Sequence, residues 1–463
     1  MTKNLTAGSP VKLIILFTLP LLIGNLFQQL YAVADALVVG RMIGVDALAA
    51  VGASGSLQFL LFGFAMGAST GMGIPVARAF GSGDLRATRR AVAAGAIISA
   101  CIAVAITLIG EFGSHALLTL LGTPAELMHD AERFLTVFFA GSVATVAFNF
   151  LSSMIRALGD SRTPLVFLVI ASVLNVGLVV AFIGWFHLGV GGAALATVVA
   201  QGISVLLCLV LIGFRIPELR LRASDWRVGR LELGEAARLG LSMGFQMSVI
   251  ALGAAVLQYG INTLGTDAVA AFTAAMRVDQ VAVIPLASVS VAISTYVAQN
   301  RGAAAWWRIR HGVQRATLLT VGLSLVLSLV IVAFGTDLVR LFVGAGEDHV
   351  VALAHEYLMV NGALYWVLAL LFVWRGALQG MGSTWVPTAA GLMELLARAV
   401  VGLILVGQLG FFGVAIAAPL AWVGALVPLT IAWFLQRRRL LRAERSARLQ
   451  PAASEVPVAT LAR

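Results

Sequence analysis

The sequence predicts an all-α integral membrane protein in which twelve transmembrane helices form two pseudo-symmetric six-helix lobes around a central cleft. Of the 463 residues, 60% are hydrophobic and only 11% are charged, less than half the charged fraction typical of soluble domains. Apolar stretches of roughly 20 residues, enough to cross a bilayer, recur along the chain. The expected spans cover residues 11–37, 47–75, 91–109, 134–155, 164–182, 190–214, 236–264, 268–297, 313–334, 351–373, 386–406 and 412–435.

An internal repeat predicts the two lobes. The segment Gly44–Ala50 recurs as Gly265–Ala271, and Arg156-Ala157-Leu158-Gly159 is echoed by Arg375-Gly376-Ala377-Leu378. Six spans return the chain to its starting side, so the repeats are expected to be parallel. We therefore assign residues 1–214 to the first lobe, 215–235 to a cytoplasmic connector, 236–435 to the second lobe and 436–463 to a basic, disordered cytoplasmic tail.

The net charge of +10 is unevenly distributed along the chain, and this distribution predicts the orientation of the protein in the membrane. Arg and Lys concentrate in alternate loops, which predicts that these loops and both termini are cytoplasmic in a multi-pass protein of the plasma (inner) membrane. We expect contacts with membrane lipid and none with nucleic acid, and a monomer. Cys101 and Cys208 both fall within apolar spans, which argues against a disulfide framework or a metal site. No phosphate-binding loop or catalytic cluster occurs, so the sequence predicts neither an enzyme nor a cofactor.

Charged residues inside spans are the main functional clue, because each costs about 2.5 to 3.5 kcal/mol at a helix centre. Glu394 and Arg398 are four residues apart on one helical face, a spacing that predicts an ion pair. Arg277 and Asp279 point in different directions and need partners elsewhere. We interpret them as mainly structural, with Asp279 a lesser candidate for ion coupling.

Asp35 differs because no basic residue lies three or four positions away. It shares a helical face with Gln28 and Tyr31, and a carboxylate among neutral groups is suited to take and release a proton. The alternative is a carboxylate that is simply hydrated at the membrane interface. Pro20 weakens the same helix and is a candidate hinge. Candidate partners for cation coupling on the fourth, fifth and sixth spans are Asn149, Asn175 and Thr197.

A central cleft of polar, aromatic and methionine side chains would suit amphipathic ligands. For any single residue, hydrogen bonding between helices is an equally good explanation. The candidate cleft residues are Gln28, Gln201, Gln246, Gln258, Met276, Gln280 and Tyr365.

Several segments together resemble a known family, the multidrug and toxic compound extrusion transporters. They include Pro20-Leu21-Leu22-Ile23-Gly24-Asn25, Leu30-Tyr31-Ala32-Val33-Ala34-Asp35, Arg156-Ala157-Leu158-Gly159-Asp160-Ser161-Arg162-Thr163-Pro164, Gly191-Gly192-Ala193-Ala194-Leu195-Ala196-Thr197 and Leu257-Gln258-Tyr259-Gly260-Ile261-Asn262. The resemblance implies alternating access and export of cationic or amphipathic organic molecules against an inflow of protons or sodium ions.

The resemblance also implies roles for individual residues. Asp35 matches the acidic residue of the family's first helix, and Asn175 and Thr197 match polar residues of the same first-lobe site. Val179 stands where many members have an Asp, which favours protons over sodium as the coupling ion, although sodium at Asp35 stays open. The second-lobe carboxylates of some members have no equivalent around Ile250 and Leu364.

Two other functions stay open at this point. A flippase for lipid-linked sugars of the same superfamily would need basic residues in the cleft, where the sequence places few. A membrane-embedded enzyme or a structural protein would belong to a different class, and an enzyme would need clustered nucleophile, acid and base groups.

Overall fold

Helices account for nearly all of the structure, a computed structural model that describes residues 4–343 and 346–449. Among these residues, ten helices are long and apolar enough to cross a membrane, and two bent pairs, counted as one span each, bring the number to twelve. The predicted all-α membrane fold is confirmed. The helices of the first half are α1 (Pro10–Met42), α2 (Val45–Gly81), α3 (Leu85–Leu120), α4 (Ala125–Ala140), α5 (Ser142–Ala157), α6 (Arg162–Gly184) and α7 (Gly189–Arg215).

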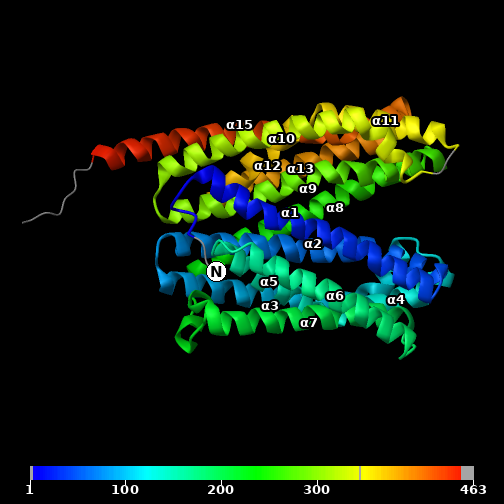
Figure 1. Cartoon of the computed structure of the whole chain (residues 1–463), viewed down its shortest axis with the longest axis horizontal. Coiled ribbons are helices and arrows are strands. Elements are labelled where there is room, and N and C mark those ends of the chain that lie inside the picture. Colours follow the sequence, from blue (N-terminus) through cyan, green and yellow to red (C-terminus); the bar gives the residue numbers. More distant parts are fainter. Residues whose placement is uncertain (1–3, 344–345, 450–463) are drawn as a thin grey trace, which may run out of the picture.

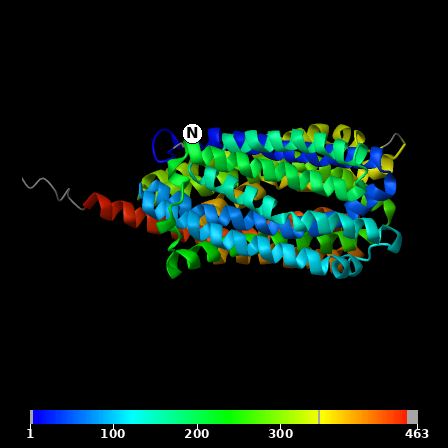
Figure 2. The same cartoon turned by 90° about the horizontal axis from the view of Figure 1, so that it is seen from below.

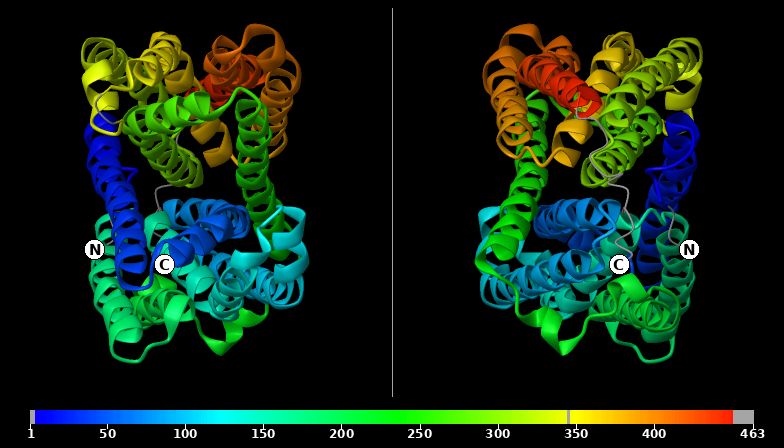
Figure 3. Two further views of the ribbon diagram at one scale, coloured as in Figure 1. Left: turned by 90° about the vertical axis from the view of Figure 1, so that its right-hand side faces the viewer. Right: turned by 90° about the vertical axis from the view of Figure 1, so that its left-hand side faces the viewer.

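The second half repeats this order. Its elements are α8 (Arg230–Asn262), α9 (Thr266–Gly302), α10 (Trp306–Arg340), α11 (Asp348–Ala363), α12 (Tyr365–Gly380), α13 (Trp385–Val400), a π-helical turn η3 (Val401–Leu405), α14 (Val406–Leu409) and α15 (Phe411–Leu449). Figure 1 shows most helices of the two halves in two layers. The end views in Figure 3 show α1 and α8 crossing from one bundle to the other, where α1 packs on α9 and α8 packs on α2.

Both bent spans lie at equivalent places in the two lobes. Helices α4 and α5 meet at 50° around Gly141, and α11 and α12 meet at 52° around Leu364. A Cβ atom on Gly141 would lie 2.2 Å from Val198 of α7. The glycine therefore permits the close packing of this bend against α7, since a larger residue would not fit.

Left-handed glycines mark the repeat in the backbone. Gly44 and Gly265 have φ values of 132° and 97°, and Gly159 and Gly382 have values of 86° and 75°. Because Gly159 corresponds to Gly382, the structure shifts the repeat proposed from the sequence around Arg156. Arg375 lies one helical turn earlier in its half than Arg156 does.

The connector and the tail differ from the sequence predictions. The connector contains two 3-10 turns, η1 (Pro217–Leu219) and η2 (Ala223–Trp226), and ends where α8 begins at Arg230, so residues 230–235 are helical. Helix α15 continues to Leu449, and the prediction of a disordered tail is wrong for residues 436–449. An ion pair between Arg310 and Glu444 at 3.2 Å fastens this extension to α10. Figure 2 shows it projecting beyond the bundle. Residues 450–463 of the predicted tail lie outside the described residues.

The lobes meet closely at the end of the molecule that carries the arginines of segments 78–90 and 301–315, which we call the Arg-rich end. Arg78 of α2 donates two hydrogen bonds of 2.6 Å to the carboxylate of Glu235 on α8. Gln299 of α9 donates to the carbonyl of Ala157 in the first lobe at 2.8 Å and accepts from the N–H of Leu5 at 2.9 Å. These bonds tie the first lobe and the N-terminal segment to the second lobe.

Candidate functional site

A polar cluster joins α1, α6 and α7 in the first lobe. The hydroxyls of Tyr31 and Thr197 are 3.1 Å apart, and Asn175 Nδ2 donates to Thr197 Oγ1 at 2.9 Å. Asn175 and Thr197 are buried, and Asp35 lies half-buried one turn after Tyr31 on α1. The structure therefore joins Tyr31, Asn175 and Thr197 by hydrogen bonds, and Asp35 lies one turn from this group on α1. These are four of the five residues that the sequence selects for cation coupling.

Several acceptor oxygens in this part of the first lobe lack a donor. Asp35 Oδ1, Asn175 Oδ1 and Gln201 Oε1 are buried and have no hydrogen-bond partner among the described residues. A buried acceptor without a donor is costly, so such groups call for an explanation in a native structure. A proton, a cation or a ligand with a donor group would satisfy them.

The fifth predicted coupling residue, Asn149, lies elsewhere. Its Nδ2 donates to the carbonyl of Thr145 on its own helix at 2.9 Å. Together with Pro20 and Gln28 it lines a small pocket of about 90 Å³ between α1, α5 and α6. Helix α1 runs unbroken through Pro20. The polar face predicted on α1 therefore contributes to two sites. Gln28 lines the small pocket, and Tyr31 and Asp35 belong to the cluster with α6 and α7.

A second buried carboxylate lies in the other lobe. The hydroxyl of Tyr365 on α12 donates to Asp279 Oδ1 on α9 at 2.6 Å, and both residues are buried. The hydroxyl of Tyr357 donates to the sulfur of Met276 at 3.4 Å on the same side of α9. Tyr365 has no exposed surface in this structure and lines no open cleft in it. It is the partner that Asp279 needs.

The predicted pair of Glu394 with Arg398 is also wrong. Glu394 of α13 forms a buried ion pair with Arg375 of α12. Arg375 lies beyond the predicted span 351–373, whereas α12 continues to Gly380 and carries Arg375 inside the lobe. The guanidinium of a neighbouring helix reaches Glu394, so the local spacing of four residues does not decide its partner.

The three second-lobe glutamines that the sequence selects for the cleft lie in different surroundings. Gln246 is buried between helices, where it accepts from Gln379 at 2.9 Å and donates to the carbonyl of Pro387 at 3.2 Å. In this structure the oxygen and the nitrogen of its side-chain amide are both hydrogen-bonded to neighbouring helices, and Gln246 lines no open cleft. Gln258 donates to Asn262 at 2.8 Å along the exposed side of α8. Gln280 is half-buried on α9 beside Asp279.

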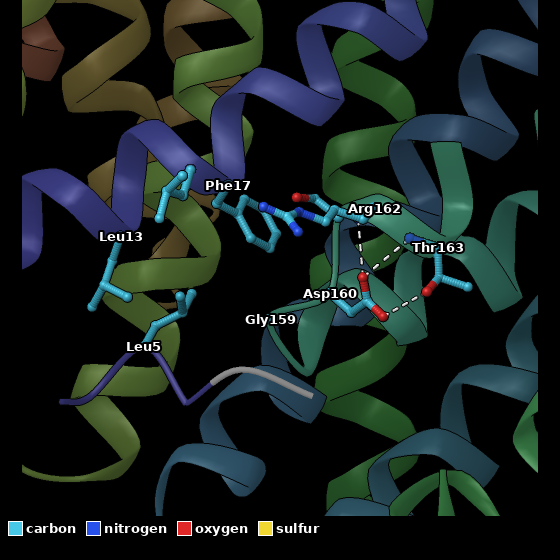
Figure 4. Close-up of a pocket in the computed structure, with 9 residues that line it drawn as sticks. Leu5, Leu13, Phe17, Gly159, Asp160, Arg162 and Thr163 are labelled. Atoms are coloured by element: carbon cyan, nitrogen blue, oxygen red, sulfur yellow. Dashed lines mark hydrogen bonds between the residues drawn. The ribbon is translucent and has the colours of Figure 1, made fainter. Parts of the chain in front are cut away.

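The loop between α5 and α6 forms a tight, charged turn beside the N-terminal segment. Asp160 accepts from the backbone N–H groups of Arg162 and Thr163 at 3.0 and 3.1 Å. Burial acts to raise the pKa of Asp160, but hydrogen bonds, among them those from the hydroxyl and the backbone N–H of Thr163, hold the pKa below its usual value. Figure 4 shows this turn on one side of a cavity of about 300 Å³, with Leu5 and Phe17 on the other side.

Few oxygen atoms around Asp35 could act as ligands for a metal ion. Within residues 4–343 and 346–449, no group of three or more His, Cys, Asp or Glu side chains could hold a metal. Val179, one turn beyond Asn175 on α6, is fully buried and supplies no oxygen. The cluster offers one carboxylate, one amide oxygen and the hydroxyls of Tyr31 and Thr197, which are already hydrogen-bonded to each other, and this is a small set for a hard cation.

Comparisons with known proteins identify the family. The family model described as MatE matches residues 20–183 and 242–404. The chain is 30% identical over 386 residues to the probable multidrug resistance protein YpnP of Bacillus subtilis, covering 82% of this chain and 84% of that protein. It is 25% identical over 387 residues to YoeA, a probable multidrug resistance protein of the same organism, covering 82% and 83% of the two chains.

The fold also matches solved structures. The crystal structure of a MATE protein in complex with MaL6 superimposes with a TM-score of 0.86 at 23% identity, and the match covers 96% of this chain and 100% of that one. The resemblance predicted from the sequence is confirmed by the family model and by this agreement in fold.

Proposed function

Since the chain belongs to the MatE family of multidrug transporters, we propose that it exports cationic or amphipathic organic molecules by antiport with a cation. The carrying observation is Asp35, a carboxylate of the first lobe whose buried Oδ1 has no donor among the described residues. Binding of a cation there satisfies the unpartnered Oδ1 atom, and this gain in free energy favours binding of the ion within the membrane.

Protons are the coupling ion that we propose. Protonation gives the Asp35 carboxyl an O–H donor, and Asn175 Oδ1 is an acceptor in the same cluster that has no partner among the described residues. A sodium ion would need several oxygen ligands at once, and the buried Val179 supplies none. A sodium-coupled mechanism is the alternative that the experiment below separates.

Coupling requires that the ion and the cargo favour different orientations of the lobes. The Arg78–Glu235 pair and the contacts of Gln299 hold the Arg-rich end closed in this structure. We propose that this end faces the cytoplasm, because basic loops remain on the cytoplasmic side of the inner membrane. Both termini then lie in the cytoplasm. The cleft between the lobes opens alternately to the cytoplasmic and to the opposite side of the membrane.

The proposal is tested by transport in inverted membrane vesicles with an imposed proton gradient. Asp35→Asn keeps the size of the side chain and removes its titration, so cargo-dependent proton release is expected to disappear. Asp46→Asn, an exposed carboxylate in the first turn of α2, is the matched control and is expected to transport like the wild type. Undiminished proton release by Asp35→Asn would refute the role of Asp35, and transport driven by a sodium gradient alone would refute proton coupling.

A further inference from the structure

A long apolar groove lies on the first lobe, apart from the Asp35 cluster. It has a volume of about 500 Å³ and runs between α3, α5 and α7 to the connector after α7. Small side chains of α3 and α5, Ala100 and Ala147 among them, leave the space open. Its walls include Val143 and Leu209, which are 55% and 50% exposed. In a membrane protein, exposed apolar side chains at mid-helix face lipid, so the groove opens to the bilayer.

The groove makes the two lobes unequal. In the second lobe, α10 packs directly against α15, whereas the corresponding helices of the first lobe, α3 and α7, make no comparable contact with each other. The gap between α3 and α7 is therefore a feature of the first lobe alone, and the equivalent helices of the second lobe do not share it.

One end of the groove is basic and is held in place by hydrogen bonds. Arg220 and Trp226 of the connector line it. Arg89 Nη2 donates to the carbonyl of Pro217 at 2.8 Å, which fixes the connector on α3. Arg220 Nε donates to the carbonyl of Ile212 at 3.2 Å, and the two Nη groups have no hydrogen-bond partner among the described residues. The guanidinium is thus oriented and still has donors to offer.

We propose that this groove is a binding site for an anionic phospholipid, with an acyl chain between α3 and α7 and the phosphate on Arg220. The two parts of such a lipid match the two parts of the site. The apolar walls suit the chain, and Arg220 beside the half-exposed Trp226 suits the headgroup level, where basic and aromatic side chains concentrate. This site is separate from the proposed transport site, and a failure of either proposal leaves the other standing.

Native mass spectrometry of the purified full chain tests the proposal with added phosphatidylglycerol and with phosphatidylcholine of the same acyl chains. Arg220→Gln is expected to lower the fraction bound to phosphatidylglycerol about fivefold, from the loss of one basic contact. Arg222→Gln removes an exposed arginine that does not line the groove, and it is expected to bind like the wild type. Ala147→Trp fills the groove and is expected to lower binding of both lipids.

Three results would overturn the proposal. The first is equal binding of the two lipids by the wild type, and the second is equal loss of phosphatidylglycerol in Arg220→Gln and Arg222→Gln. The third is binding of tetraphenylphosphonium that Ala147→Trp abolishes while phosphatidylglycerol stays bound, which would make the groove a cargo site. If Ala147→Trp does not elute as a single species, the comparison of Arg220→Gln with Arg222→Gln decides.

Discussion

The contact between α2 and α9 at the Arg-rich end is so close that a single methyl group is expected to open it. A Cβ atom added to Gly302 would lie 1.8 Å from the carbonyl oxygen of Arg78, whereas ordinary contact begins at 3.4 Å. The two backbones would have to separate by about 1.6 Å. Overpacking of this kind costs about 1 to 3 kcal/mol, which lowers the ratio of closed to open protein by roughly 5- to 150-fold.

The assay is a distance measurement between spin labels on the two lobes. Labels at Leu85 and Trp307, both exposed, report on the Arg-rich end after Cys101 and Cys208 have been replaced. Gly302→Ala is expected to move a substantial part of the distance distribution to longer values. Gly322→Ala adds the same methyl group where no atom lies within 4 Å, and it is expected to leave the distribution unchanged. An unchanged distribution in Gly302→Ala would refute the argument that this backbone contact controls closure.

Two further substitutions test the buried carboxylates of the second lobe by thermal unfolding in detergent. Tyr365→Phe removes the donor to Asp279 and is expected to lower the free energy of unfolding by about 1 to 3 kcal/mol. Tyr259→Phe, at an exposed position, is expected to leave it unchanged. Equal unfolding midpoints for the two variants would contradict the role of this bond. Glu394→Gln leaves Arg375 buried without its counterion and is expected to cost about 3 to 5 kcal/mol, and a midpoint equal to that of the wild type would show that the pair is not formed.

Hydropathy predicted the spans well because each transmembrane helix must satisfy its own backbone hydrogen bonds, which makes its length a local property. The bends at Gly141 and Leu364 were not predicted. Neither position carries a proline, and the space for the bend at Gly141 comes from another helix, beside Val198.

The candidate site was predictable where its residues lie on one helical face and less so where tertiary partners decide. Tyr31 and Asp35 follow from the spacing along α1, and their approach to Asn175 and Thr197 was implied by the family resemblance. The partners of Asp279 and Glu394 come from α12, and spacing along one helix carries no information on which neighbouring helix is near. Arg375 was misplaced because α12 continues past the end of its apolar stretch.

The two lobes differ in how they treat a buried carboxylate, and this difference favours the first lobe as the place of coupling. Asp279 accepts from Tyr365, and Glu394 is paired with Arg375. Protonation of either carboxylate removes its negative charge and so weakens a bond that is already in place. Asp35 Oδ1 has no such donor among the described residues, so a proton gains a vacant acceptor there and loses no existing bond. A shared scaffold can therefore carry ion coupling in one lobe while the charges of the other lobe hold helices together.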